Sequence, residues 1–346
     1  MFLYLKKLFK KIFTSQKATV PIKFVKKKIV CPLCKSSKIT ALLPSNKHDY
    51  ESGKQIICDD IFITLCENCG LVFENPQISV TELRDYGEKH YYNEIKNPLS
   101  EHDEHQKLFN KLRWEVLADR LPWTRIKKAL DVGATGAWSA WIKDQYPEIE
   151  SIVIEPSSQA IALCKNAYPQ VKPVHGLFEE FEDEPNSYNL ITFFYSLYTI
   201  SKPLDALKKV SQLLSEDGLL LVCISHLRME IEIWNNRLPW VNMAHLIRGV
   251  PLVYYSRRTL KQLLNAAGFS PVNEFIAQHP DSSDHWAGRQ EHFIIAKKNN
   301  LSKNQQSFQS LFDPVERERS RDFFLKYCDS ITDRSISEFF AQENVD

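Results

Sequence analysis

The chain has 346 residues, of which 43% are hydrophobic and 25% are charged. These values are ordinary for a folded globular protein and exclude a disordered or collagen-like chain. The length predicts one large domain with one or two accessory units. No apolar run is long enough for a signal peptide or a transmembrane helix, so we expect a cytoplasmic protein.

Positive charge is concentrated at the N-terminus. The formal net charge is +1, but residues 1–28 contain nine lysines and no acidic residue, so the rest of the chain is acidic. An acidic body is poorly suited to tracking phosphates, and we expect no specific nucleic-acid binding. Within residues 1–17 the apolar side chains share one helical face beside lysine pairs, which favours peripheral contact with an anionic membrane. A helix packed on the body, or a solvated end, is the alternative.

Four of the eight cysteines have the spacing of metal ligands. Cys31 and Cys34 form one C-x-x-C pair, and Cys66 and Cys69 form a second. Each such turn points two thiolates at one point, and two turns complete the tetrahedral sulfur shell that zinc prefers. A redox role would need a thioredoxin-like setting, which the flanking sequence lacks. The spacing therefore predicts a structural zinc site in a ribbon over residues 29–78. Cys58 is a weaker alternative ligand, because it has no C-x-x-C partner.

Residues 79–125 are expected to form a helical bridge. A helix is predicted over residues 104–119, and an aromatic and histidine-rich stretch, DYGEKHYYNE, precedes it. This stretch could form one wall of a substrate pocket, or it could pack between domains.

Residues 126–298 alternate short apolar runs with helical periodicity, as a parallel sheet with crossover helices requires. The pattern predicts a Rossmann-like α/β domain of about seven strands. Strands are expected at residues 128–132, 151–155, 171–175, 189–194, 219–224, 271–275 and 292–297. Helices are expected at residues 137–146, 158–167, 203–214 and 256–268. A polar linker and a helix candidate follow over residues 299–346.

A glycine-containing turn follows the first expected strand and leads directly into a helix. The turn runs through Asp131, Val132, Gly133, Ala134, Thr135 and Gly136. Small residues here let the backbone approach a nucleoside ligand at the carboxyl edge of the sheet. Glu155 ends the second strand, 22 positions after Gly133, where its carboxylate can accept both hydrogen bonds of a ribose diol. In the alternative interpretation, the glycines serve only turn geometry.

These motifs make the chain similar to the class I S-adenosylmethionine-dependent methyltransferases, in particular bacterial members with an N-terminal zinc ribbon. The resemblance covers roughly residues 31–298. Its ribbon part rests on CPLC and LCENCGLVFENP, and its catalytic part on ALDVGATG, VIEPSSQAI, SYNLITFF, SEDGLLLVCI and LLNAAGF. It implies a seven-stranded sheet with helices on both faces, S-adenosylmethionine as cofactor and structural zinc. Its link to sugar and surface-glycan pathways implies a small-molecule, glycan or nucleotide-sugar acceptor.

The resemblance also implies roles for single residues. Asp131 and Gly133 would flank the methionine part of the cofactor, and Glu155 would hold the ribose. The remaining cofactor positions are Leu177 and Phe178, which would border the adenine, and Tyr195, which would close the floor of the pocket.

Two departures from the family pattern stand out. Thr135 and Ala137 occupy positions where the family usually alternates glycines, and added Cβ atoms could narrow the approach to the cofactor. After the fourth strand, Tyr195 begins Tyr-Ser-Leu-Tyr, where related enzymes often have a His-x-x-Glu-His-like segment. That difference removes an obvious acid or base.

Methyl transfer mainly needs alignment and desolvation, so a general base is optional. If a base exists, the best candidates are His226, after the fifth strand, and His245, in the following insertion, because both should lie near the carboxyl edge of the sheet. A lone histidine is more often structural or exposed.

Two other functions have some support in the sequence. GATG and the Tyr198-to-Lys202 spacing resemble a short-chain dehydrogenase, but Tyr198 follows Gly133 by only 65 residues, closer than in that family. Alternatively, a degenerate methyltransferase could serve as a scaffold, although the retained Asp131 and Glu155 argue against it.

Overall fold

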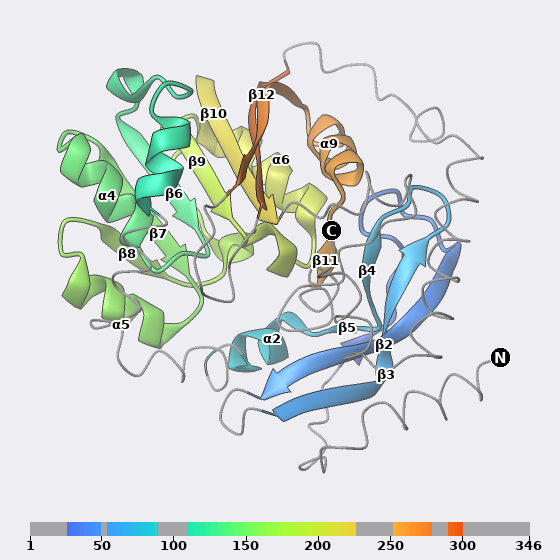
Figure 1. Ribbon diagram of the computed structural model, residues 1–346. Helices are drawn as coiled ribbons and strands as arrows, with labels where there is room; N and C mark the ends of the chain where they lie inside the picture. Colours follow the sequence, from blue (N-terminus) through green and yellow to red (C-terminus); the bar gives the residue numbers. More distant parts are fainter. Residues whose placement is uncertain are drawn as a thin grey trace, which may run out of the picture. The chain divides into compact units, whose positions relative to one another are not determined.

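The computed structural model describes residues 26–49, 54–86, 88, 110–225, 252–278 and 290–299. The chain divides into two compact units. One contains the four spaced cysteines and the other contains the large sheet with its helices (Figure 1).

The first unit is built from antiparallel strands. A short pair joins β1 to β5, and a four-stranded sheet has the order β11-β4-β3-β2. The ribbon predicted over residues 29–78 would contain β2 to β5, whereas β1 and β11 lie outside those bounds. The pairing of β11 with β4 was not anticipated, because β11 comes from far along the chain. The strands are β1 (Lys26–Lys27), β2 (Ile39–Asp49), β3 (Lys54–Cys66), β4 (Val72–Asn75), β5 (Gln77–Ile78) and β11 (Val253–Tyr254).

The second unit is organised around a seven-stranded sheet of order β12-β13-β10-β9-β6-β7-β8. The five strands from β8 to β10 are parallel, and β13 runs antiparallel to both β10 and β12. The predicted Rossmann-like sheet and each of its expected strands are confirmed. The strands are β6 (Lys128–Val132), β7 (Glu150–Glu155), β8 (Lys172–His175), β9 (Tyr188–Phe194), β10 (Leu214–Ser225), β12 (Phe269–Gln278) and β13 (Gln290–Lys298).

Helices cover both faces of this sheet (Figure 1). The helix at residues 110–117, α4 and α5 pack on one face, while α6 and α9 lie on the other. Local sequence fixes where helices begin: the Ser157 hydroxyl accepts the Ala160 amide at the start of α5, and Ser256 and Thr259 form a capping box before α9. The named helices of this unit are α2 (Val80–Tyr86), α4 (Ala137–Gln145), α5 (Ser158–Ala167), α6 (Pro203–Leu213) and α9 (Arg257–Ala266).

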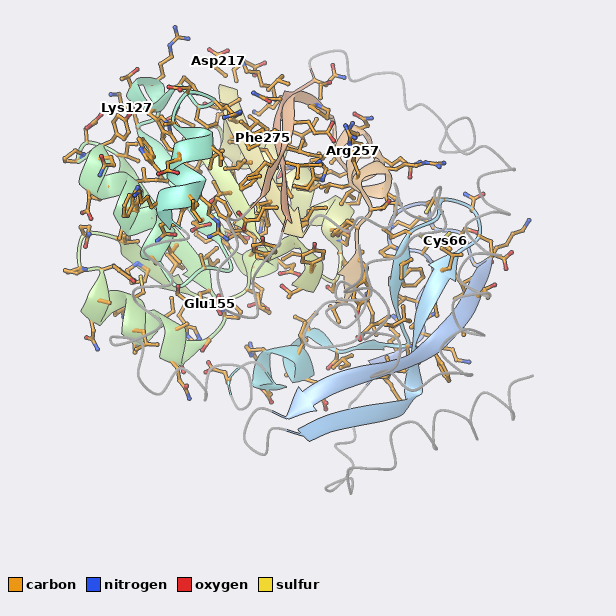
Figure 2. All side chains as sticks on the ribbon, in the orientation of Figure 1. Cys66, Lys127, Glu155, Asp217, Arg257 and Phe275 are labelled. Atoms are coloured by element: carbon orange, nitrogen blue, oxygen red, sulfur yellow. The ribbon has the colours of Figure 1, made fainter. Side chains whose placement is uncertain are left out.

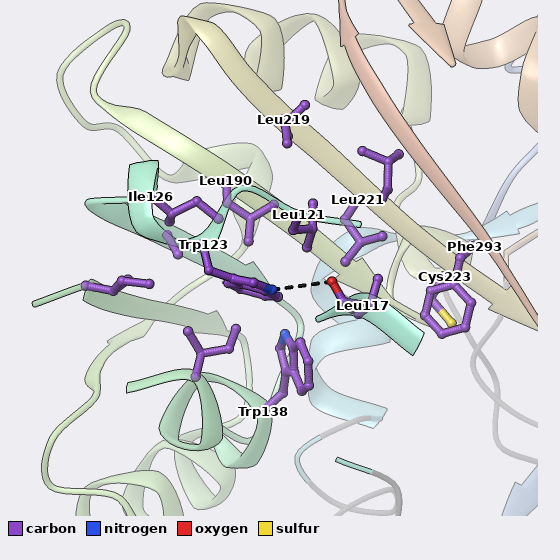
Figure 3. Packing of buried hydrophobic residues seen from close by; sticks show 14 residues of the cluster. Leu117, Leu121, Trp123, Ile126, Trp138, Leu190, Leu219, Leu221, Cys223 and Phe293 are labelled. Carbon is purple, nitrogen blue, oxygen red and sulfur yellow. Dashed lines mark hydrogen bonds between the residues drawn. The ribbon is translucent and has the colours of Figure 1, made fainter. Parts of the chain in front are cut away.

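Aromatic side chains dominate the core on the α4 face. Trp123 is 3% exposed, meets the Trp138 ring edge-on, and donates its indole N–H to the Leu117 carbonyl at 3.3 Å (Figure 3). Cys223 and Phe293 extend this cluster across β10 and β13. Burial of each large apolar side chain contributes about 1.5–3 kcal/mol, so this cluster anchors the residues 110–117 helix and α4 to the sheet.

Several predictions fall outside the described residues. They concern the basic tail at residues 1–17, most of the aromatic stretch at residues 86–92, and the C-terminal helix candidate at residues 314–340. Within the described ranges, none of the helices combines the length and apolar character needed to cross a bilayer.

Candidate functional site

The turn between β6 and α4 requires glycine at two positions. Gly133 and Gly136 have φ values of 69° and 93°, in the left-handed region that side chains disfavour. A Cβ on Gly133 would lie 2.5 Å from the Ser196 Cβ, and one on Gly136 would lie 2.4 Å from the Cys164 Sγ. The backbone of the turn therefore packs tightly between the loop after β9 and helix α5. The half-buried Ala134 and Thr135 lie between the two glycines.

Asp131, at the sheet end of this turn, is 3% exposed. Its carboxylate accepts hydrogen bonds from the Thr192 hydroxyl at 2.7 Å and the Ser139 hydroxyl at 3.4 Å. Burial raises the pKa of Asp131 to about 6, while the Thr192 hydrogen bond and the charge of Arg113 oppose that rise. Asp131 thus ties β6 to β9 and α4 behind the turn.

Glu155 lies at the carboxyl end of β7, as expected, and is 3% exposed (Figure 2). One of its carboxylate oxygens accepts the Ser157 amide at 3.0 Å. The Gly133 amide donates to the Ile154 carbonyl at 2.8 Å. The glycine turn and the acidic residue predicted to hold a ribose are therefore adjacent at one edge of the sheet.

The carboxylate of Glu88, which no sequence motif marks, lies at the start of α5. It accepts the Ser158 amide at 2.6 Å and the Ser158 hydroxyl at 3.0 Å, and lies 3.7 Å from the His175 Nε2. Glu88 belongs to the DYGEKHYYNE stretch. Glu88 therefore contacts residues at the carboxyl ends of β7 and β8, namely Ser158 and His175.

The two predicted adenine-border residues occupy different environments. Leu177 lines a cleft of about 510 Å³ together with His175 and Gly176. Phe178 is 3% exposed and its ring meets that of Phe193 edge-on at 5.6 Å. The lining of this cleft does not include Gly133 or Glu155, so the cleft does not itself place Leu177 beside the predicted cofactor site. Phe178 mainly supports the loop from the core.

Tyr195 follows β9 at the same edge of the sheet. Its φ is 59°, its amide donates to the Cys223 carbonyl at 3.0 Å, and its hydroxyl donates to Glu291. Glu291 also forms an ion pair with Arg113 at 3.0 Å. Neither Arg113 nor Glu291 was predicted to belong to the site, because each is a single charged residue in a segment that contains no recognisable motif.

Ser196 was also missed. It is 6% exposed, contacts the position of Gly133, and its hydroxyl has no hydrogen-bond partner among the described residues. A buried hydroxyl beside the glycine turn is suited to hydrogen bonding with a ligand bound there.

The four predicted zinc ligands come together in the first unit. The four Sγ atoms all lie within 4.8 Å of one another, and the Cys31–Cys69 and Cys34–Cys66 Sγ distances are both 3.5 Å. A tetrahedral zinc site with Zn–S bonds of about 2.3 Å would have sulfurs about 3.8 Å apart. The observed cluster therefore fits a zinc ion.

The two cysteine turns share one backbone pattern. The Lys35 amide donates to the Cys31 carbonyl at 3.0 Å, and the Gly70 amide donates to the Cys66 carbonyl at 2.9 Å. Lys35 and Gly70 both have positive φ, 60° and 75°. Hydrogen bonding among the four sulfurs lowers the thiol pKa of Cys34 and Cys66 and raises the thiol pKa of Cys31 and Cys69.

The two candidate general bases, His226 and His245, lie outside the described residues. Their roles therefore stay predictions.

A family model described as "Methyltransferase domain" matches residues 105–274, which include the glycine turn, Glu155 and Tyr195. The chain is similar to a solved SAM-dependent methyltransferase from Thermotoga maritima, described as a possible histamine N-methyltransferase. That structure is 18% identical, with 63% of this chain and 100% of the other covered at a TM-score of 0.45. An S-adenosylmethionine dependent methyltransferase from Mesorhizobium loti is 16% identical, with coverages of 55% and 100% and a TM-score of 0.42. No curated protein matches the chain.

The family match and the observed sheet together support the fold of the S-adenosylmethionine-dependent methyltransferases for the second unit.

Proposed function

We propose that this protein is a class I methyltransferase that transfers a methyl group from S-adenosylmethionine to a small-molecule, glycan or nucleotide-sugar acceptor. The observation that carries the proposal is the junction of the glycine turn with the end of β7. There Gly133 donates its amide to the Ile154 carbonyl, and the buried Glu155 follows directly. Nucleoside cofactors bind at this edge of α/β sheets.

Each residue of the junction has a defined task in this proposal. Gly133 and Gly136 let the turn adopt positive φ and pack against Ser196 and Cys164, which would hold its backbone at the edge where the cofactor binds. Glu155 accepts hydrogen bonds from the ribose hydroxyls, and Leu177 borders the adenine. Asp131 holds the turn in place through Thr192.

The bound cofactor would supply a methyl group on a positively charged sulfur. In the in-line displacement, a bond forms between the acceptor nucleophile and the methyl carbon as the sulfur–carbon bond breaks, and an O–H or N–H acceptor loses its proton. The protein contributes alignment and exclusion of water. His226 or His245 would take that proton only if a base is needed.

Calorimetric titration tests the cofactor assignment. We expect S-adenosylmethionine to bind the zinc-loaded protein and NADH not to bind. Glu155→Gln should weaken S-adenosylmethionine binding at least tenfold, because the ribose hydroxyls lose a charged acceptor. Glu150→Gln is the matched control, because Glu150 lies exposed at the opposite end of β7.

The outcome also separates the proposal from the scaffold alternative. If S-adenosylmethionine does not bind to folded, zinc-loaded protein, the methyltransferase proposal fails and a scaffold role is the better account. Binding of NADH instead would point to an oxidoreductase.

The zinc assignment is part of the same proposal. A structural zinc ion would stabilise the first unit by binding four thiolates, those of Cys31, Cys34, Cys66 and Cys69. The distances between their sulfurs support this assignment. Elemental analysis should find one zinc per chain, and Cys66→Ser should reduce that content. Cys223→Ala, which removes a buried thiol outside the cluster, should leave it unchanged. Full zinc content in Cys66→Ser would argue against the site.

Location and partners are proposed from the sequence alone. We propose a cytoplasmic protein whose residues 1–17 contact the anionic inner face of a membrane, with no specific nucleic-acid partner. Sedimentation with phosphatidylserine-containing vesicles should retain the full chain and release a variant lacking residues 1–17.

A further inference from the structure

A buried charge pair lies beside the proposed methyl-transfer site. Glu291 pairs with Ser225 at the carboxyl end of β10, and Cys223 of β10 pairs with Phe194, the residue before Tyr195. Glu291 and Tyr195 therefore lie at the same edge of the sheet. Tyr195 in turn precedes Ser196, which contacts the glycine turn.

Three contacts hold Tyr195 in place. Its amide donates to the Cys223 carbonyl at 3.0 Å, its hydroxyl donates to a Glu291 carboxylate oxygen, and its ring centroid lies 5.7 Å from the Arg113 guanidinium carbon. An aromatic residue with φ of 59° costs on the order of 1–2 kcal/mol. These three contacts therefore hold Tyr195 in a backbone conformation that is unfavourable by itself.

Burying the ion pair of Arg113 and Glu291 costs desolvation free energy. The side chains of Arg113 and Glu291 are only 12% and 1% exposed, and their oxygen–nitrogen distance is 3.0 Å. The surrounding sheet face is apolar, formed by residues such as Phe194 and Phe293. Apolar side chains of similar volume are often at least as stabilising as a buried ion pair, so stability alone does not account for this one.

The ion pair of Arg113 and Glu291 determines which way the Tyr195 hydroxyl can hydrogen-bond. A phenol carries one proton, and that of Tyr195 is directed at Glu291. Toward any further partner the Tyr195 oxygen must act as a hydrogen-bond acceptor. It would then orient a group that donates, such as a hydroxyl or an amine.

We propose that Glu291, neutralised by Arg113, is a positioning residue that fixes Tyr195 as a hydrogen-bond acceptor for the hydroxyl or amine that is methylated. This rests on the proposed methyltransferase function and narrows its acceptor to O–H and N–H nucleophiles. Glu291 lies beyond residues 105–274, so its part in the site is not contained in the family match.

The first test asks whether Glu291 sets the state of Tyr195. Ultraviolet resonance Raman spectra of the wild type should contain a tyrosine signal typical of a hydroxyl that donates to a carboxylate. Tyr188 also donates its hydroxyl to a carboxylate, that of Asp183 at 2.6 Å, so Tyr195→Phe should remove only part of that signal. Glu291→Gln should shift the part that Tyr195 contributes. Glu274→Gln is the matched control. Glu274, on β12, also pairs with a cation, Lys261 of α9 at 2.5 Å, and lies 2.9 Å from the His292 Nε2, but it is on the α9 face. An unchanged spectrum in Glu291→Gln would overturn the proposal.

The second test measures methyl transfer from S-adenosylmethionine to nucleotide sugars, simple alcohols and simple amines. We expect Tyr195→Phe and Glu291→Gln to lower kcat/KM for hydroxyl or amine acceptors about 10- to 100-fold, while S-adenosylmethionine affinity changes less than about threefold. Glu274→Gln should leave both unchanged. The double variant Arg113→Gln/Glu291→Gln should regain thermal stability without regaining activity.

The failures of the two proposals are distinguishable. Loss of S-adenosylmethionine binding in the wild type would overturn the methyltransferase function itself. A wild type that binds it but methylates none of these acceptors, or variants that keep full kcat/KM, would overturn only the role assigned to Tyr195 and Glu291.

Discussion

Asp131→Asn should make the second unit more stable at neutral pH, even though it removes a residue of the proposed site. Asp131 is 3% exposed, and burial raises its pKa to about 6 from 3.8. Keeping this carboxylate ionised in the folded protein at pH 7.5 therefore costs about 3 kcal/mol. Asparagine has nearly the same shape, and its oxygen can still accept the hydrogen bond from Thr192.

The sign follows from proton binding. Between pH 3.8 and about 6 the folded protein binds the proton and the unfolded chain does not. The stability gained from protonation is fully present below pH 3.8 and is lost as the pH rises through about 6. The difference between the variant and the wild type should thus grow from near zero at pH 4 to about 2–3 kcal/mol at pH 7.5.

Urea unfolding at a series of pH values, followed by tryptophan fluorescence, measures this difference. Trp123 and Trp138 lie in the core of the same sheet face and report on its unfolding. Effects common to both proteins, including those at the cysteine cluster, cancel in the comparison. A pH-independent difference, or a variant that is less stable at pH 7.5, would refute the reasoning.

Three further outcomes are expected. Gly133→Ala should lower stability by at least about 2 kcal/mol and weaken S-adenosylmethionine binding at least tenfold by calorimetry, because φ is 69° and the new Cβ meets Ser196; an unchanged affinity would count against the turn as the cofactor site. Removing metal with a chelator should lower the Tm of the wild type but not that of Cys66→Ser, as measured by calorimetric scanning; equal responses would contradict a zinc site there. Hydrogen bonds from Lys128 and Tyr188 lower the pKa of Asp183 to about 2. Asp183→Asn should therefore cost about 1–2 kcal/mol at pH 7, and this cost should disappear as the pH falls through about 2 in urea unfolding; a cost that does not fall with pH would contradict the ion pair.

Local patterns in the sequence were sufficient for most of the fold. Short apolar runs separated by helical periodicity predicted all seven strands of the large sheet. The clearest runs belong to the central parallel strands, because strands buried on both faces need continuous apolar sequence. C-x-x-C spacing predicted the cluster of Cys31, Cys34, Cys66 and Cys69, because each turn brings its own pair together. The pairing of β11 with β4 had no such local signal.

The site was predictable only where its residues follow strands. Gly133 and Glu155 end neighbouring parallel strands, so strand order alone places them together. Arg113 and Glu291 are 178 positions apart, and their ion pair depends on how a helix docks on the sheet. Gly136 also appeared out of register with the usual glycine spacing, yet its φ of 93° at the start of α4 gives it a defined place in the turn.

The two cysteine turns are alike in hydrogen bonding but unequal in backbone strain. Gly70 adopts its positive φ at no steric cost, whereas Lys35 holds the equivalent conformation against its own Cβ. A metal-free chain would therefore relax first around Cys31 and Cys34, while the turn around Cys66 and Cys69 keeps its shape. Metal uptake would then have a direction, beginning on the second turn and drawing the first into place, and the half-buried Cys34 would be the thiol most open to oxidation before uptake is complete.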